Sequence, residues 1–173
     1  RLVFSAAAPD WLGPEHRRFL AEYDLGGWER FVESKDELPF GVNMAFRAQA
    51  LRGPEPFDIR LGRRGRVLLS GEEAALLRRM LRRGAKILYS PQAAVSHRVR
   101  ADRLGDRYFI DRFYWQGATE ARMDRMDYGL PRRLWRLATR AALALKIRAS
   151  AWLARLAGDS ARQRLMRQFA AYP

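Results

Sequence analysis

A serine and a glutamate three residues apart stand at the start of the clearest predicted helix. Ser70 and Glu73 have the spacing of a capping box, in which each side chain bonds the backbone N–H of the other residue. A carboxylate at a helix N-terminus is held in its ionised form, so Glu73 or its neighbour Glu72 could also accept a proton. The residue pattern alone favours the cap. If Glu73 caps the helix, Glu72 is the better base.

Other polar residues fall on predicted strands and loops. Asn43 and Arg47 flank a stretch with strand character, residues 40–46, whose alternation puts Asn43 on one face and Met44 and Phe46 on the other. The amide of Asn43 could contact a substrate or support a neighbouring loop. Both interpretations stay open at this point.

Asp58 and His97 are the remaining candidates outside the helices. Asp58 lies in a loop rich in proline and glycine, where a carboxylate commonly caps a turn. His97 ends a predicted strand and is followed by Arg98 and Arg100. A lone histidine is more often a packed or hydrogen-bonded residue than a metal ligand.

The elements that must position these residues alternate between short strands and helices. Leu76, Leu77, Met80 and Leu81 form an apolar stripe at helical period, and Gly84 ends that helix. We expect residues 29–37 to form a loop, 47–51 a helical turn and 53–65 a loop. The expected strands are 2–8, 40–46, 86–89 and 94–99, and the expected helices are 11–23, 70–83 and 102–126. This alternation predicts an α/β domain up to about residue 100, followed by a helical tail.

The tail begins with a long amphipathic helix, predicted for residues 131–156. No acidic residue falls between Asp127 and Asp159, and arginines surround the apolar stripe. This pattern is typical of a helix that lies in a membrane interface, with Trp135 and Trp152 at headgroup level. Packing of the stripe on the rest of the chain explains the pattern equally well. A last helix is expected to end near Phe169. The stripe consists of Leu130, Leu134, Leu137, Ala141, Leu145, Ala149, Trp152 and Leu156.

Composition limits the class of protein and its partners. The chain has 173 residues, 48% of them hydrophobic, with 33 Lys+Arg against 19 Asp+Glu, which gives a net charge of +14. This balance predicts a globular domain that meets an anionic partner. The absence of cysteine excludes a disulfide framework and a thiol nucleophile from this chain, and two histidines exclude a multi-histidine metal cage. No apolar stretch reaches the roughly 20 residues of a membrane-spanning helix.

Four stretches taken together resemble one family. They are PFGVNMAFR at 39–47, FDIRLG at 57–62 running on to LLSGEE at 68–73, ILYSPQAAVSHRV at 87–99, and RFYWQG at 112–117. In order and spacing they are similar to the second half of bacterial-type family 2 glycosyltransferases. The resemblance covers roughly residues 9–120.

The resemblance implies a fold and an activity. The fold would be the C-terminal part of a GT-A, Rossmann-like domain, with the acceptor-side half in residues 1–128 and a basic amphipathic helical tail in 129–173. The nucleotide-binding half, with its metal-holding Asp-x-Asp motif, is absent and is expected before Arg1. The expected enzyme inverts the sugar that it moves from a nucleotide-sugar donor to a glycan or lipid-linked acceptor, in cell-envelope or polysaccharide synthesis. Its divalent metal, Mn or Mg, would be held largely by the missing half.

The resemblance also assigns roles to residues. The family's base stands in a Glu-Asp pair at the start of this helix, where the chain reads Glu72-Glu73, so the carboxylate is kept on an arm one methylene longer. With the flanking motifs, catalysis by Glu73 or Glu72 becomes the favoured interpretation over the cap. His97 would help to hold the metal. The expected substrate-binding residues are Asn43, Arg47, Asp58, Gly71, Arg98, Trp115 and Gln116.

For several of these residues a purely structural role stays open. Arg98 and Arg100 could neutralise a diphosphate or be solvated. Asp58 could orient sugar hydroxyls or cap a turn. The aromatic residues of the 113–115 run could stack on a sugar or lipid, although large aromatics more often belong to a core.

A different class of function competes with the transferase. A basic module without chemistry could bind an anionic membrane surface or RNA, but no RNA-binding motif is present, so nucleic acid is not the expected partner. We expect the transferase to be cytoplasmic and peripheral on the inner face of the plasma membrane. Half of an α/β sheet would expose an edge, so we expect the chain to aggregate when isolated.

Overall fold

The structure is a computed structural model that describes residues 1–52, 56–65 and 67–160. These residues form two compact units built from separate chain segments. The first unit comprises Arg1–Ala8, Leu12–Gly62 and Gly71–Ala101, and the second comprises Pro9–Trp11, Arg63–Ser70 and the chain from Asp102 on. The predicted division into an acceptor-side half (residues 1–128) and a helical tail (129–173) concerns function. The compact units do not test it, so it stays a prediction.

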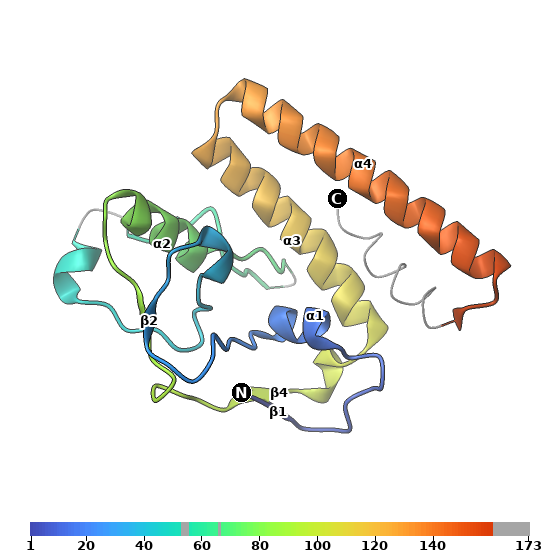
Figure 1. Ribbon diagram of the computed structural model, residues 1–173, viewed down its shortest axis with the longest axis horizontal. Coiled ribbons are helices and arrows are strands. Elements are labelled where there is room, and N and C mark those ends of the chain that lie inside the picture. The colour runs from blue at the N-terminus through green and yellow to red at the C-terminus, as the bar shows by residue number, and fades with distance from the viewer. Residues whose placement is uncertain (53–55, 66, 161–173) are drawn as a thin grey trace. The chain divides into compact units, whose positions relative to one another are not determined.

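Two small sheets lie in the first unit (Figure 1). β1 (Leu2–Phe4) pairs in parallel with β4 (His97–Val99), with Leu2 opposite His97. β2 (Arg30–Phe31) pairs antiparallel with β3 (Leu88–Tyr89). Together with the helices they make a mixed structure that agrees with the predicted α/β class. The finer GT-A assignment stays a prediction.

The main helix of the first unit is α2 (Glu72–Arg82), which carries the predicted apolar stripe into a core. Leu76 and Leu77 are buried, and Leu77 clusters with Val32 and Leu38. The helix ends where predicted, because Gly84 adopts a positive φ of 79° that a residue with a Cβ disfavours. The N–H groups of Gly84 and Ala85 then bond the carbonyls of Leu81 and Met80, both at 3.0 Å, which is the Schellman pattern.

The stretch 40–46 is not a strand, so this prediction was wrong. Asn43 donates its backbone N–H to the Phe40 carbonyl at 3.4 Å, which makes a turn, and no strand pairs with the segment. Its side chains still alternate as predicted. Met44 and Phe46 pack partly buried against the core, whereas Asn43 is exposed. The alternation of apolar and polar residues therefore reflects packing on the core cluster of Val32, Leu38 and Leu77 rather than pairing in a sheet.

Several element bounds also differ from the predictions. The helix expected at 11–23 is only α1 (Pro14–Arg17) followed by the 3₁₀ turn η1 (Arg18–Leu20). Pro14 stands in the first turn, where proline is well tolerated, and Ala21 ends the segment with a φ of 66°. The expected loop at 29–37 contains β2 and the 3₁₀ turn η2 (Lys35–Glu37). The helical turn expected at 47–51 is confirmed as η3 (Ala48–Leu51).

The second unit contains the two long helices α3 (Asp106–Asp127) and α4 (Leu130–Leu156), which follow the short turn η4 (Ala101–Arg103) (Figure 1). Both helices agree with the predicted segments within a few residues. Phe109 and Phe113 of α3 are fully buried, and Trp11 meets Phe109 edge-on at 5.4 Å between ring centroids. The helix expected to end near Phe169 lies outside the described residues.

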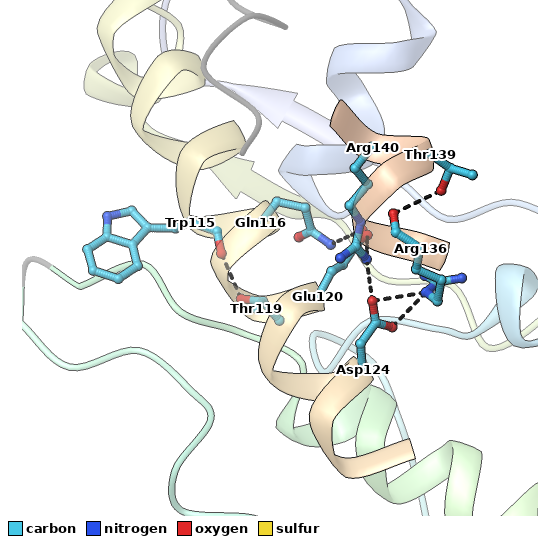
Figure 2. A network of polar contacts seen from close by, with 8 residues as sticks. All are labelled: Trp115, Gln116, Thr119, Glu120, Asp124, Arg136, Thr139 and Arg140. Carbon is cyan, nitrogen blue, oxygen red and sulfur yellow. Dashed lines mark hydrogen bonds and ion pairs between the residues drawn. The ribbon is translucent and has the colours of Figure 1, made fainter. Parts of the chain in front are cut away.

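Polar contacts join α3 to α4 (Figure 2). The buried carboxylate of Asp124 lies 2.9 Å from Arg136 Nε and 2.8 Å from Arg140 Nη2. Arg140 also reaches Glu120 at 3.0 Å. Asp124 raises the pKa of Arg136, chiefly by the side-chain hydrogen bond. Two arginines of α4 are therefore fixed on α3 by carboxylates.

Candidate functional site

The N-terminus of α2 is shaped by glycine rather than by a side-chain cap. Gly71 is the N-cap residue, with φ 95° and ψ 6°, and its carbonyl accepts the first helical bond from the Ala75 N–H at 2.8 Å. This left-handed conformation is readily adopted only by glycine. Gly71 therefore has a backbone role here, and its predicted contact with a substrate stays a prediction.

The predicted capping box between Ser70 and Glu73 is wrong. No side chain caps α2. Ser70 belongs to the second unit, where its N–H donates to Thr119 Oγ1 at 3.2 Å and its hydroxyl accepts from Arg112 at 3.3 Å. The left-handed turn at Gly71 separates Ser70 from the helix that it was expected to cap.

Glu73 instead bonds the turn that precedes Met44. Its Oε1 accepts a hydrogen bond from the Gly41 N–H at 3.2 Å. Its Oε2 is buried and accepts no hydrogen bond from the described residues. A Cβ on Gly41 would lie 3.1 Å from Glu73 Oε1, closer than most real Cβ contacts. One carboxylate oxygen is thus anchored by a backbone N–H, and the other has no such donor among the described residues.

Glu72 lies beside a second glycine. A Cβ on Gly62 would come within 3.5 Å of the Glu72 carboxyl carbon, and Gly62 itself has a φ of 92°. Two glycines from different loops therefore lie against the two adjacent glutamates. Gly41 and Gly62 fall within stretches that carry the family resemblance, but no sequence pattern gave either of them a role in the site.

Asn43 supports a neighbouring loop. Its Nδ2 donates to the Ala93 carbonyl, which ties the 40–43 turn to the turn after Pro91. The amide nitrogen is therefore engaged within the protein, as the structural interpretation of Asn43 expected. Contact of this exposed side chain with a substrate stays a prediction.

Asp58 is engaged by Arg60. The Asp58 carboxylate accepts from the Arg60 backbone N–H at 2.9 Å, from Nε at 3.0 Å and from Nη2 at 2.7 Å. The side-chain hydrogen bond from Arg60 is the main cause that lowers the pKa of Asp58 from 3.8 to about 2. Asp58 caps a turn, and any role toward a sugar hydroxyl stays a prediction.

Three predicted site residues lie at other places in the first unit. His97 begins β4, is partly buried, and donates its backbone N–H to the Arg1 carbonyl at 2.8 Å. Arg98 is exposed opposite Val3 in the parallel pair. Arg47 is exposed directly before η3. Their predicted roles stay predictions.

The described part of the chain does not form a metal site by itself. No group of three or more His, Cys, Asp or Glu side chains in it could hold a metal ion. His97 would therefore be at most one ligand among several from elsewhere.

Trp115 and Gln116 lie on α3, in the second unit. The Gln116 amide donates to Glu120 at 3.2 Å, next to the Arg140 ion pair, whereas the Trp115 indole points away from that network (Figure 2). Of the aromatic run, Phe113 is core, as the structural interpretation expected, and Tyr114 is 52% exposed.

A cavity of about 280 Å³ lies in the first unit and was not predicted. Tyr23 lines it, donates its hydroxyl to the Glu37 carbonyl at 2.8 Å, and has its pKa raised to about 12, first by burial and then by Glu37. Phe40, the residue before Gly41, is also part of its wall. Its polar lining includes Arg18, Glu22, Asp24, Asp36 and Glu37. These residues come from separate segments, so no local motif marks them.

The chain is similar in sequence to the glucosyl-dolichyl phosphate glucuronosyltransferase of Haloferax volcanii, with 27% identity over 128 residues. The match covers 70% of this chain and 41% of that enzyme, so the chain spans less than half the length of this relative. No protein-family model and no solved structure matches the chain. The likeness supports the general prediction that this chain is related to glycosyltransferases.

Proposed function

We propose that this chain is the acceptor-side part of a nucleotide-sugar-dependent glycosyltransferase of family 2 with a GT-A fold. The observation that carries the proposal is the anchored carboxylate of Glu73 at the N-terminus of α2. Its Oε1 is held by the Gly41 N–H, and its Oε2 is buried without a hydrogen bond from the described residues. The likeness to a transferase supports the same conclusion.

In the proposed reaction Glu73 acts as the general base. The acceptor hydroxyl gives its proton to the Glu73 carboxylate while its oxygen forms a bond to the anomeric carbon of the donor sugar. The bond between that carbon and the diphosphate oxygen breaks, and the nucleoside diphosphate leaves. A base positioned in this way contributes about 10²–10⁴ in rate. Attack opposite the leaving group inverts the anomeric centre.

The donor and its metal belong to residues outside this chain in the proposal. A divalent metal would neutralise charge on the departing diphosphate. The described residues offer no cluster for it, so we place its main ligands in the nucleotide-binding half that the resemblance predicts. The relative's name includes a dolichyl phosphate, and we propose a lipid-linked or nascent envelope glycan as the acceptor.

The test is Glu73→Gln in the complete protein, assayed with nucleotide-sugar donors and polyprenyl-linked acceptors. Glutamine can still accept the Gly41 N–H bond through its amide oxygen but cannot take a proton. We expect kcat to fall by about 100-fold or more while the KM for the donor changes little. Glu72→Gln is the matched control one residue away, and its activity should stay within a few-fold of the wild type.

Three results would count against the proposal. Equal activity of Glu73→Gln and the wild type would show that Glu73 is not the base. A large loss in Glu72→Gln alone would move the base to Glu72. The absence of sugar transfer by the complete wild-type protein, across donors and with Mn or Mg supplied, would remove the transferase assignment itself.

A further inference from the structure

We propose that α4 lies along an anionic membrane surface through its apolar stripe, which runs from Leu130 to Leu156. The proposal rests on a difference in side-chain type between two sides of the helix. The side of α4 that contacts α3 carries arginines, while the side that carries the leucines is exposed. This inference does not depend on the transferase activity.

In the described part of the chain the apolar stripe is exposed and does not pack on another element. Leu134 is 57% exposed, Leu145 is 68% exposed and Trp152 is 60% exposed. The remaining leucines of the stripe are exposed to a similar degree, and so is Trp135 beside it. Single exposed leucines are normal in proteins. A continuous apolar stripe along the length of a helix instead indicates a surface that another molecule covers.

A different set of side chains makes the packed side of α4. Arg136 and Arg140 are bound to Asp124 and Glu120, and Ile147 is partly buried farther along the helix. At 100° per residue this packed side is centred about 135° away from the apolar stripe. The ion pairs therefore turn the leucines away from α3.

Charge favours an anionic membrane over a second copy of the chain as the molecule that covers the stripe. Of the exposed cations in the described part of α4, Arg148 lies on the same side as the stripe, whereas Lys146 and Arg132 lie farther round the helix. No acidic residue lies between Asp127 and Asp159, so two copies that met along the stripe would bring Arg148 of each copy together with no carboxylate of this helix to pair it. An anionic lipid surface can pair Arg148 and accept the leucines at once.

Two details of α4 fit the membrane interface. Trp135 and Trp152 are exposed, and indoles favour the headgroup level because one edge is apolar and the N–H is polar. Arg148 lies on the same side of α4 as the stripe, and its long side chain can bury its methylenes while the guanidinium reaches the headgroups. None of the described helices has both the length and the apolar character to cross a bilayer. The two tryptophans and Arg148 support a position of α4 on the membrane surface.

The experiment is vesicle flotation of the complete protein, without donor or acceptor. Neutral phosphatidylcholine vesicles are compared with vesicles in which phosphatidylglycerol replaces part of the lipid. We expect wild-type protein to float with the anionic vesicles and much less with the neutral ones. Leu137→Glu should lower the bound fraction about tenfold or more.

Thr139→Glu is the matched control for this test. It makes the same change in charge two residues away, on an exposed part of α4 outside the stripe, and should bind nearly as the wild type does. Leu145→Gln removes apolar surface without adding charge and should weaken binding several-fold. Circular dichroism of each variant checks that the helices remain.

Three results would overturn the proposal. Equal losses in Leu137→Glu and Thr139→Glu would show that charge alone governs binding and that the stripe is not the contact. Failure of the wild type to float with anionic vesicles would exclude the membrane as its occupant. A wild-type dimer that Leu137→Glu converts to a monomer would make a second copy the occupant.

Discussion

Glycine at position 41 allows its backbone N–H to approach the Glu73 carboxylate, and this contact defines the candidate site at the residue scale. The two residues are 32 positions apart, so no local spacing could have predicted that they meet. The sequence did mark Glu73, because a carboxylate at the start of an amphipathic helix is a recognisable pattern. The sequence could not show whether the Glu73 carboxylate bonds the backbone N–H of Ser70 or that of Gly41.

Replacing Gly41 by alanine should displace the carboxylate without unfolding the protein. The new Cβ would lie 3.1 Å from Glu73 Oε1, so Glu73 must shift by a few tenths of an ångström. We expect kcat of the complete enzyme to fall by about tenfold, because misplacement of a catalytic group is costly. Gly27→Ala, where the added Cβ meets nothing within 4 Å, should leave kcat unchanged. Equal kcat values for the two variants would contradict this prediction.

Asp58 should contribute stability that depends on pH. Its pKa is lowered from 3.8 to about 2 in the folded protein, chiefly by the side-chain hydrogen bond from Arg60. The contribution is therefore complete above about pH 4 and is lost as the pH falls toward 2. Because Arg60 is largely exposed, we expect only about 1 kcal/mol.

The measurement for Asp58 is urea unfolding of the wild type and Asp58→Asn at several pH values. The difference in free energy of unfolding between the two proteins should be largest near neutral pH and should vanish near pH 2. Arg60→Gln should remove the same increment, and the double variant should lose little more. If the difference in free energy of unfolding between the wild type and Asp58→Asn stays constant from neutral to acid pH, the lowered pKa of Asp58 does not contribute to stability.

At the scale of elements, Asp124 joins α3 to α4. Asp124 is 5% exposed and its carboxylate binds Arg136 and Arg140, so removing the charge takes away the carboxylate bound to Arg136 and leaves Arg140 with Glu120. We expect Asp124→Asn to lower the free energy of unfolding by about 2 kcal/mol or more. Chemical denaturation followed by helical circular dichroism measures this.

The control for Asp124 lies on the same helix. Asp111 pairs with Arg107 at 3.0 Å, but this pair is exposed. Asp111→Asn should therefore cost no more than about 0.5 kcal/mol. If the two variants unfold at the same denaturant concentration, the network in Figure 2 does not hold the helices together.

The elements that the sequence predicted well are those whose own residues determine them. α4 and the C-terminal end of α2 follow from helical periodicity and from a glycine that stops the helix, and both signals are local. The predicted strand at 40–46 failed because a strand needs a partner, and the alternating Met44 and Phe46 instead face the core beside α2. The capping box failed because Gly71 turns the backbone into the left-handed region one residue before α2 begins. The cavity beside Phe40 depends on tertiary structure alone.

At the scale of the whole molecule, the two sheets of the described chain are only two strands each. Val3, Phe31 and Leu88 are exposed on these strands. Unpaired strand edges with apolar side chains promote association between chains. We expect the 173-residue chain, expressed alone, to self-associate, which light scattering coupled to size exclusion measures.

Charging an edge should reduce this association. Val3→Lys places a cation on β1 and should shift the population toward monomer, whereas Thr139→Lys adds the same charge on α4, outside both sheets and outside the apolar stripe, and should not. A wild-type preparation that is monomeric and melts cooperatively would contradict the expectation.

The two sides of α4 should also have diverged differently among the relatives of this protein. A paired guanidinium has a fixed geometry, so Arg136 and Arg140 should resist replacement even by lysine, together with Asp124. The apolar stripe has no such geometry to satisfy, so leucine, isoleucine, phenylalanine and tryptophan should exchange there freely. Evolution along this helix would then keep the identity of residues on one side and only their hydrophobicity on the other.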